Sequence, residues 1–214
     1  MTDLMLDRMV LEDVGYNPRR IAEAIHAQLG GLSGPVPVHA VAFARDIIEI
    51  REEPLTSFEG ALLTTPQRGY GSILLNTQST PQRRRFTVGH ELGHFLNPLH
   101  KPTAPDAFFC SRADMIVSAA DSRHLRQEAE ANVFAIELLT PRKRLARHLA
   151  PPADLQHVLN IASEFDISKE AGARRYVALH DEKLALVFSR NGKARYLARG
   201  PAFPHAAGAA MKTS

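Results

Sequence analysis

Two histidines and a glutamate stand in a short segment where their spacing suits metal chemistry. The segment is His90-Glu91-Leu92-Gly93-His94. On a helix, residues four apart project from one face, so both imidazoles can bind one tetrahedral ion. Glu91 lies beside that face, and its carboxylate can take the proton of an attacking water whose pKa the ion lowers. The spacing therefore predicts metal-assisted hydrolysis of an amide, with Glu91 as general base.

A catalytic zinc site needs a third protein ligand, and the sequence offers a near and a far candidate. The near candidate is His100, which completes the pattern His-Glu-x-x-His-x-x-Asn-x-x-His. This pattern resembles that of the metzincins, except that Asn97 stands where those enzymes have glycine. Asparagine tolerates the left-handed turn, but Pro98 and the lack of a clear methionine turn disfavour His100.

The far candidate is Glu128, in a segment with the pattern of a buried helix. Glu128, Ala131, Ala135 and Leu138 share one stripe of that helix. The small alanines leave room for the helix of His90 to approach, and a cation would offset the cost of burying the carboxylate. Glu130 is the reserve candidate, two positions further along.

The elements that position these residues follow from start and stop signals. Thr80 and Pro81 predict the start of the metal-binding helix, which Asn97-Pro98 ends. A second long helix is predicted over about residues 123–139. Residues 100–121 lack periodicity and are expected to form a long loop between the two helices.

Strand signals precede and follow these helices. Residues 47–50, 60–65 and 71–76 predict a sheet of about three strands, the last two of them antiparallel neighbours. Near the end of the chain, Asn191-Gly192 predicts the turn of a β-hairpin. Further helices are predicted over residues 18–29, 152–164 and 168–179, with a short one within residues 39–46.

The elements together predict an α+β fold. Residues 1–150 are expected to form a mainly helical metallopeptidase domain around the small antiparallel sheet. Residues 151–203 add a helical segment and the C-terminal β-hairpin, which we expect to pack on that domain. Residues 204–214 are rich in alanine and are expected to be flexible.

Composition limits the classes of function. The chain has 214 residues, 44% hydrophobic and 23% charged, which is ordinary for a globular protein and excludes a largely disordered one. A single cysteine, Cys110, excludes an internal disulfide and a cysteine-built zinc site, so we expect ligands among His, Asp and Glu. The absence of a long apolar run and the acidic start disfavour a membrane span and a secretory signal, so a cytoplasmic protein is expected.

Two blocks of the sequence resemble the ImmA/IrrE family of metallopeptidases. Residues 83–96 are similar to the family's metal-binding helix. Residues 128–141 are similar to its Glu-x-x-Ala-Asn-x-Phe-Ala-x-x-Leu-Leu-x-Pro block, although Thr140 stands where the family usually has methionine. The resemblance covers most of the chain, and it implies a zincin-like fold.

The resemblance also implies roles for the residues and a substrate class. It implies His90, His94 and Glu128 as ligands of zinc, with manganese as the other ion to consider, and Glu91 as the base. Members of the family cleave or otherwise relieve helix-turn-helix repressors, often in stress responses or mobile elements, so such a repressor is the expected partner. The sequence does not choose a group that stabilises the oxyanion, although Tyr176, His180 and several arginines are candidates.

Two other functions compete with catalysis. Residues 154–164 and 168–179 could form a DNA-binding helix-turn-helix, with Arg174 and Arg175 facing DNA. The net charge of +3, with a pI near 9.2, is weak support for nucleic-acid binding and favours a packed helix pair. Alternatively, the protein could bind a repressor without cutting it, as a toxin-antitoxin or phage-related component in which the metal is structural.

Overall fold

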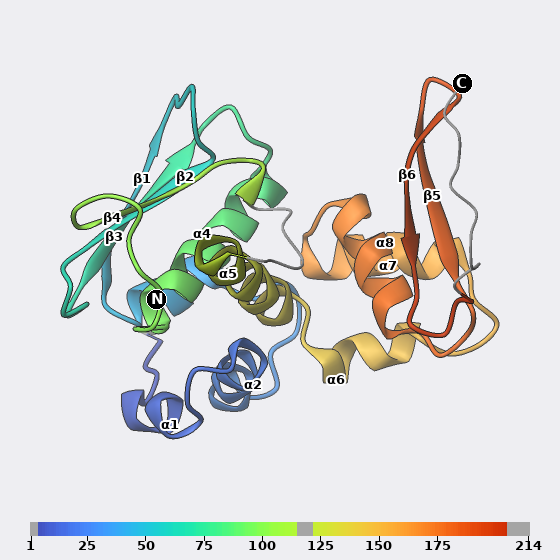
Figure 1. The fold of residues 1–214 in the computed structure, drawn as a ribbon. Coiled ribbons are helices and arrows are strands. Elements are labelled where there is room, and N and C mark those ends of the chain that lie inside the picture. The colour runs from blue at the N-terminus through green and yellow to red at the C-terminus, as the bar shows by residue number, and fades with distance from the viewer. Residues whose placement is uncertain (1–3, 115–121, 205–214) are drawn as a thin grey trace. The chain divides into compact units, whose positions relative to one another are not determined.

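The structure is a computed structural model that describes residues 4–114 and 122–204. It divides into two compact units (Figure 1). The first unit comprises Met1–Arg144 with Glu164–Ile167, and the second comprises Leu145–Ser163 with Ser168–Ser214. Among the residues that the structure describes, no helix has both the length and the apolar character needed to cross a bilayer. The predicted flexible tail, from residue 205 on, lies outside the described residues.

A four-stranded mixed sheet forms one layer of the first unit (Figure 1). Its strands are β1 (Ile47–Glu53), β2 (Gly60–Thr64), β3 (Gly71–Asn76) and β4 (Ala107–Cys110), in the order β1-β3-β2-β4. The pairs β2–β3 and β2–β4 are antiparallel, whereas β1 runs parallel to β3. The predicted α+β class is confirmed, but the prediction of about three antiparallel strands is wrong in strand number and in the direction of β1.

The long loop predicted over residues 100–121 contains the strand that was missed. Only four residues, Ala-Phe-Phe-Cys, form β4. Such a segment is too short to show an alternation of apolar and polar residues, and its strand character depends on pairing with β2.

Three helices of the first unit begin where the sequence predicts, at Pro18, Pro81 and Arg123, whereas the helix Arg8–Asp13 was not predicted. Asn17, Thr80 and Ser122 each cap a helix by accepting backbone N–H groups through the side chain. Proline follows the first two caps at the first helical position. The helices are α1 (Arg8–Asp13), α2 (Pro18–Leu29), α3 (Val38–Phe43), α4 (Pro81–Leu96) and α5 (Arg123–Leu139).

Small residues bring α4 close to α5. A Cβ atom added at Gly89 would lie 3.3 Å from the Cα of Ala135, and one added at Gly93 would lie 3.2 Å from the Cα of Ala131. Cβ atoms rarely come this close to another atom. The backbones of α4 and α5 can therefore approach this closely only because glycine and alanine occupy the contact. The prediction that Ala131 and Ala135 make room for the approaching helix is confirmed.

The sheet approaches α4 closely at a third glycine, Gly60 at the start of β2. A Cβ atom at Gly60 would overlap the Cγ2 atom of Thr87 and lie 3.1 Å from the carbonyl oxygen of Leu74. Gly60 therefore lets the start of β2 pass close to α4. Thr87 cannot easily move aside, because it is buried and its hydroxyl donates to the carbonyl of Arg83 at 3.0 Å.

We expect Gly60→Ala to destabilise the protein by about 1 to 3 kcal/mol, because the added methyl group overpacks the contact between β2 and α4. Chemical denaturation of the metal-free protein measures this change. Gly69→Ala is the matched control, since a Cβ atom there meets nothing within 4 Å. Equal stability of the two variants would show that Gly60 does not govern this packing.

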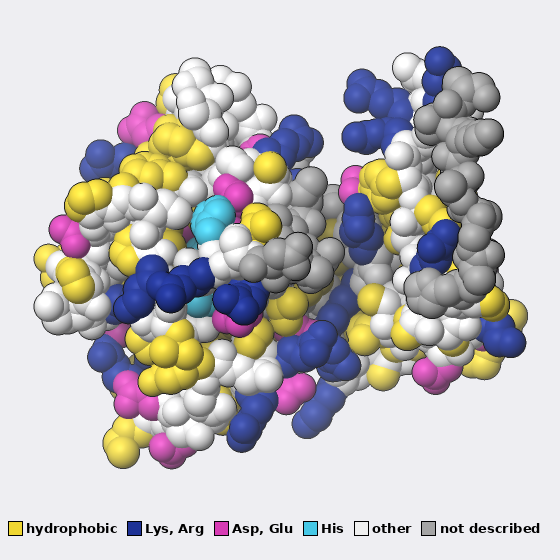
Figure 2. Space-filling model, viewed as in Figure 1, with side chains coloured by type: hydrophobic (Ala, Val, Ile, Leu, Met, Phe, Trp, Pro, Cys, Tyr) yellow, Lys and Arg dark blue, Asp and Glu magenta, His cyan; other side chains and the backbone are white. Residues whose placement is uncertain are grey.

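The second unit contains most of α7 (Leu155–Phe165), α8 (Lys169–Leu179) and a two-stranded sheet of β5 (Ala185–Arg190) and β6 (Lys193–Arg199). The short α6 (Arg142–Leu145) lies at the boundary between the units. Asn191 and Gly192 have φ angles of 52° and 75°, as a tight hairpin turn requires, so the predicted hairpin is confirmed. Basic side chains gather at this end of the hairpin (Figure 2).

The helix pair α7 and α8 does not present both predicted arginines to a ligand. Arg175 is buried, with 7% of its surface exposed. Arg174 stacks on the hairpin, with its guanidinium carbon 4.6 Å from the ring centroid of Tyr196. The burial of Arg175 does not suit a side chain that faces DNA, whereas the burial of Ile161 and Val177 suits a packed pair of helices. The DNA-binding alternative stays a prediction, and this geometry disfavours it.

Candidate metal centre

Three side chains that could hold a metal ion, those of His90, His94 and Glu128, converge between α4 and α5. The Nε2 atoms of His90 and His94 lie 3.1 Å apart. Glu128 places one carboxylate oxygen 3.1 Å from the Nε2 of His90 and the other 3.4 Å from that of His94. All three side chains are at most 1% exposed. The donors are therefore close together and shielded from solvent.

The separations of these donor atoms fit a single tetrahedral ion. Two ligand atoms at about 2.05 Å from a tetrahedral zinc lie roughly 3.3 Å from each other. The three separations of 3.1, 3.1 and 3.4 Å are close to this value. Two imidazoles and one carboxylate also form a donor set that catalytic zinc sites use. The residues present thus fit the metal that the sequence suggests.

Hydrogen bonding orients the ring of His90 toward this point. Its Nδ1 lies 2.9 Å from the side-chain oxygen of Asn132. The amide of Asn132 is itself fixed, because its nitrogen donates to the carbonyl of Asp114 at 2.9 Å. The asparagine oxygen can only accept, so neutral His90 carries its proton on Nδ1 and presents the lone pair of Nε2 to the donor cluster.

The electrostatics of the cluster favour a cation between its members. Burial opposes ionisation of Glu128, but the close contacts with His90 and His94 outweigh it and lower the pKa of this carboxyl. Burial lowers the pKa of His94 to about 3, so this ring is neutral. Burial also disfavours the charged form of His90, yet the hydrogen bond to Glu128 and nearby carboxylates raise its pKa. A proton and a metal ion would compete for this position.

Glu91 lies beside the cluster with one carboxylate oxygen available. The residue is buried, and burial raises its pKa to about 7. Among the residues that the structure describes, nothing hydrogen bonds to its Oε1 atom. A carboxylate that binds a proton near neutral pH is well suited to accept and return one.

Cys110 is the residue of this site that the sequence analysis missed. Its Sγ atom belongs to the group of donor atoms, with His90, His94 and Glu128, that all lie within 4.8 Å of one another. The thiol also lies 3.6 Å from the Oε2 of Glu91. A single cysteine does rule out a site built of cysteines, but it does not rule out one thiolate joining a histidine and carboxylate site. Burial raises the pKa of Cys110 well above its usual range.

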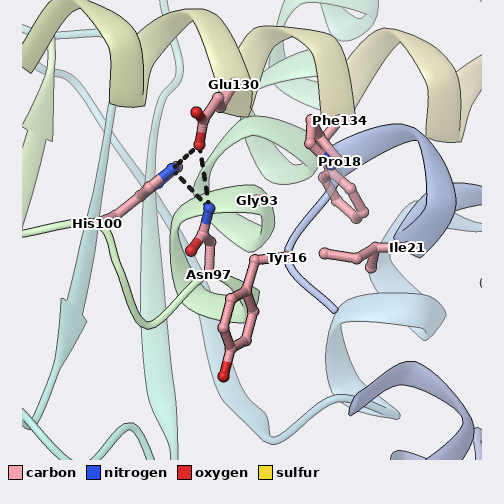
Figure 3. A pocket seen from close by; sticks show the side chains of 8 residues that line it. All are labelled: Tyr16, Pro18, Ile21, Gly93, Asn97, His100, Glu130 and Phe134. Atoms are coloured by element: carbon pink, nitrogen blue, oxygen red, sulfur yellow. Dashed lines mark hydrogen bonds and ion pairs between the residues drawn. The ribbon is translucent and has the colours of Figure 1, made fainter. Parts of the chain in front are cut away.

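His100 and Glu130, the competing third ligands, lie on the far side of His94. The Nδ1 atoms of His100 and His94 are 2.9 Å apart. Figure 3 shows the other contact of His100, in which its Nε2 is 3.0 Å from Glu130. His100 therefore contacts the Nδ1 atom of the His94 ring, with Glu130 on the other side of His100, whereas Glu128 faces the Nε2 atom of His94. The choice of His90, His94 and Glu128 as ligands stays a prediction, and this geometry favours it.

Two further residues near the site had no signal in the sequence. Arg68, in the turn between β2 and β3, donates to the carbonyls of His94, Phe95, Asn97 and His100 and so closes the end of α4. His124 lies one turn before Glu128, with its Nδ1 3.7 Å from Oε1 of that carboxylate, and its side chain is 43% exposed. It gives the buried cluster an imidazole neighbour that solvent and ligands can reach.

Comparison with models of protein families yields a match for this chain. The model of the Peptidase_M78 family, described as the IrrE N-terminal-like domain, matches residues 44–176. This range is more than half of the chain and includes α4, β4 and α5, which carry the whole cluster. A search of curated proteins finds no match.

Proposed function

This chain belongs to the Peptidase_M78 family, and from that premise we propose that it is a zinc-dependent endopeptidase. The family supports a peptidase with a metallopeptidase-like domain. We assign His90, His94 and Glu128 to the metal and Glu91 to proton transfer. The observation that carries this proposal is the convergence of three donor atoms at separations of 3.1 to 3.4 Å, with the carboxylate of Glu91 beside them.

The donor set also supports the choice of metal. Imidazole nitrogens suit zinc, whereas manganese prefers sites made of carboxylate, carbonyl and water oxygens. Two of the three proposed ligands are imidazoles, so we propose zinc rather than manganese. A bound zinc ion would supply Lewis-acid chemistry, polarising the scissile carbonyl and making water acidic enough to react at neutral pH.

The protein's own residues handle the protons. The free Oε1 of Glu91 is the proposed acceptor for the proton of the attacking water. The same carboxyl then donates this proton to the amine that leaves when the peptide bond breaks, which returns Glu91 to its ionised form. Burial of Glu91 keeps bulk water from this exchange and sets its proton affinity near neutrality.

The proposed substrate is a helix-turn-helix repressor in the cytoplasm, as the resemblance to ImmA/IrrE proteins implies. To test it, the zinc-loaded protein is incubated with purified repressors of this class, and intact-mass analysis with N-terminal sequencing reveals cleavage. We expect one repressor to yield two fragments with one new N-terminus, and phenanthroline to prevent the cut. Repressor that is bound and released from its operator without being cut would contradict the proposal.

One observation favours the second candidate, a regulatory protein with a structural metal. Structural zinc sites are closed by four protein ligands, and Cys110 is close enough to be a fourth. The contact of its thiol with Glu91 argues for the catalytic alternative, because a thiol that donates to a carboxylate keeps its proton.

We therefore expect Cys110→Ala to retain stoichiometric zinc, because three ligands remain. Metal content after dialysis, measured by mass spectrometry, checks this result. Loss of zinc from Cys110→Ala would identify a four-ligand site and favour the structural role. Serine at the same position controls for the cavity that alanine leaves.

A further inference from the structure

We propose that His100 and Glu130 are positioning residues that fix the tautomer of His94. Together they would hold the proton of His94 on Nδ1 and leave the lone pair of Nε2 facing the cluster. The inference rests on the proposed function, since it assigns His94 as a metal ligand. It also gives a role to the two residues that the sequence offered as alternative ligands.

A continuous chain of hydrogen-bonding groups runs from His94 to the surface. The Nδ1 of His94 is 2.9 Å from the Nδ1 of His100. The Nε2 of His100 is in turn 3.0 Å from the carboxylate of Glu130, a contact that Figure 3 shows. His94 and His100 are buried, whereas the side chain of Glu130 is 48% exposed. The first two members of the chain are therefore removed from water and have each other as partners.

The carboxylate of Glu130, at the end of this series of hydrogen-bonding groups, determines which atom is the donor in each hydrogen bond. A carboxylate accepts hydrogen bonds and donates none, so the Nε2 of His100 must be the donor to Glu130. With its one proton on Nε2, the neutral ring of His100 carries a lone pair on Nδ1, which faces the Nδ1 of His94. The proton between the two Nδ1 atoms then belongs to His94, and its Nε2 is left to bind the metal.

Side-chain and backbone groups around His94, His100 and Glu130 hold these three residues in position. The amide of Asn97 is oriented by the backbone N–H of Leu99, which donates to its oxygen at 3.1 Å. Its nitrogen can then donate to Glu130, at 3.2 Å, which fixes the same carboxylate oxygen that faces His100. Phe108 stacks on the ring of His94 at a centroid distance of 4.8 Å, which prevents the imidazole from turning.

The opposite tautomer is the alternative that Glu130 excludes. Without a carboxylate at this position, the amide nitrogen of Asn97, 3.0 Å from the Nε2 of His100, could donate to it instead. His100 would then carry its proton on Nδ1 and donate it to His94. The Nε2 of His94 would become an N–H group, which cannot bind a metal ion. The charge of Glu130 thus selects the tautomer through His100.

The test measures zinc affinity by competition with a chelating dye, together with thermal unfolding of the metal-free proteins. His100→Phe keeps a ring but removes both nitrogens, and we expect it to weaken zinc binding about 10- to 100-fold. His100→Gln retains an acceptor and a donor, and we expect it to restore most of this affinity. Glu130→Leu changes a half-exposed residue, which spares the core, and should weaken binding roughly 10-fold.

His26→Phe is the matched control. His26 also bonds to α5, with its Nε2 3.1 Å from the carbonyl of Glu137, but it is not part of the cluster. Its replacement is expected to leave zinc affinity unchanged even if it lowers the melting temperature. A purely structural role of His100 would give the same pattern as this control.

The outcomes separate the two proposals. Wild-type protein that binds no zinc overturns the proposed function and this inference with it. Wild-type protein that binds zinc no more tightly than His100→Phe and Glu130→Leu overturns the inference alone. The inference also fails if His100→Gln binds as weakly as His100→Phe, because the nitrogen atoms would then not be what matters.

Discussion

Replacing Glu91 with glutamine is expected to lower kcat by about two to four orders of magnitude and to leave bound zinc unchanged. Glutamine has nearly the same shape and keeps a hydrogen-bonding end, but it cannot take up the proton of the attacking water. Glu91 is not among the converging donors, so the metal keeps all three proposed ligands. This variant therefore separates proton transfer from metal binding.

Cleavage rate and metal content are measured on the same preparation of Glu91→Gln. Glu52→Gln serves as the control, because this acid lies on β1 with a side chain that is 45% exposed. Its activity and zinc content should equal those of the wild type. Repressor relief that persists undiminished in Glu91→Gln would show that the protein acts by binding rather than by catalysis.

Replacing Glu128 with alanine is expected to reduce zinc affinity by more than about 100-fold, because residues that merely orient ligands contribute roughly 10- to 100-fold. The carboxylate faces both proposed histidine ligands, at 3.1 and 3.4 Å. Its loss leaves two imidazoles, too few to hold zinc against a chelator. Activity should fall in parallel with bound metal.

Dialysis against a chelating dye followed by mass spectrometry measures this loss. Glu52→Ala controls for the removal of an acid from the same unit. Glu130→Leu is an informative comparison, because Glu130 contacts His100 and none of the proposed ligands. Its replacement should therefore reduce the bound zinc less than the replacement of Glu128. A ranking in the reverse order would make Glu130 the third ligand and contradict the assignment of Glu128.

Local signals in the sequence predicted most of the elements that carry the site. Thr80 and Pro81 begin α4 and Asn97 ends it, because capping and the fixed φ of proline are properties of neighbouring residues. The alanines of α5 predicted the close approach of α4, because only small residues allow it. The hairpin turn at Asn191 and Gly192 was predicted for the same reason, since two adjacent residues determine its φ angles.

Features that depend on residues distant in the sequence were missed. The strand β4 exists because it pairs with β2, and four residues have no periodicity of their own. Cys110 reaches the cluster only because β4 places it there. The sequence analysis also named His100 and Glu130 as candidate ligands. Spacing along the chain does not tell which nitrogen of the His94 ring a neighbouring residue contacts, and His100 contacts Nδ1.

The most direct test of the metal centre is X-ray absorption spectroscopy of the zinc-loaded protein. Ligation by His90, His94 and Glu128 predicts nitrogen and oxygen neighbours at about 2.0 to 2.2 Å, multiple scattering from two imidazoles, and no sulfur neighbour. A sulfur neighbour at about 2.3 Å would place Cys110 on the metal and contradict a three-ligand catalytic site. A spectrum without imidazole scattering would contradict the assignment of the site itself.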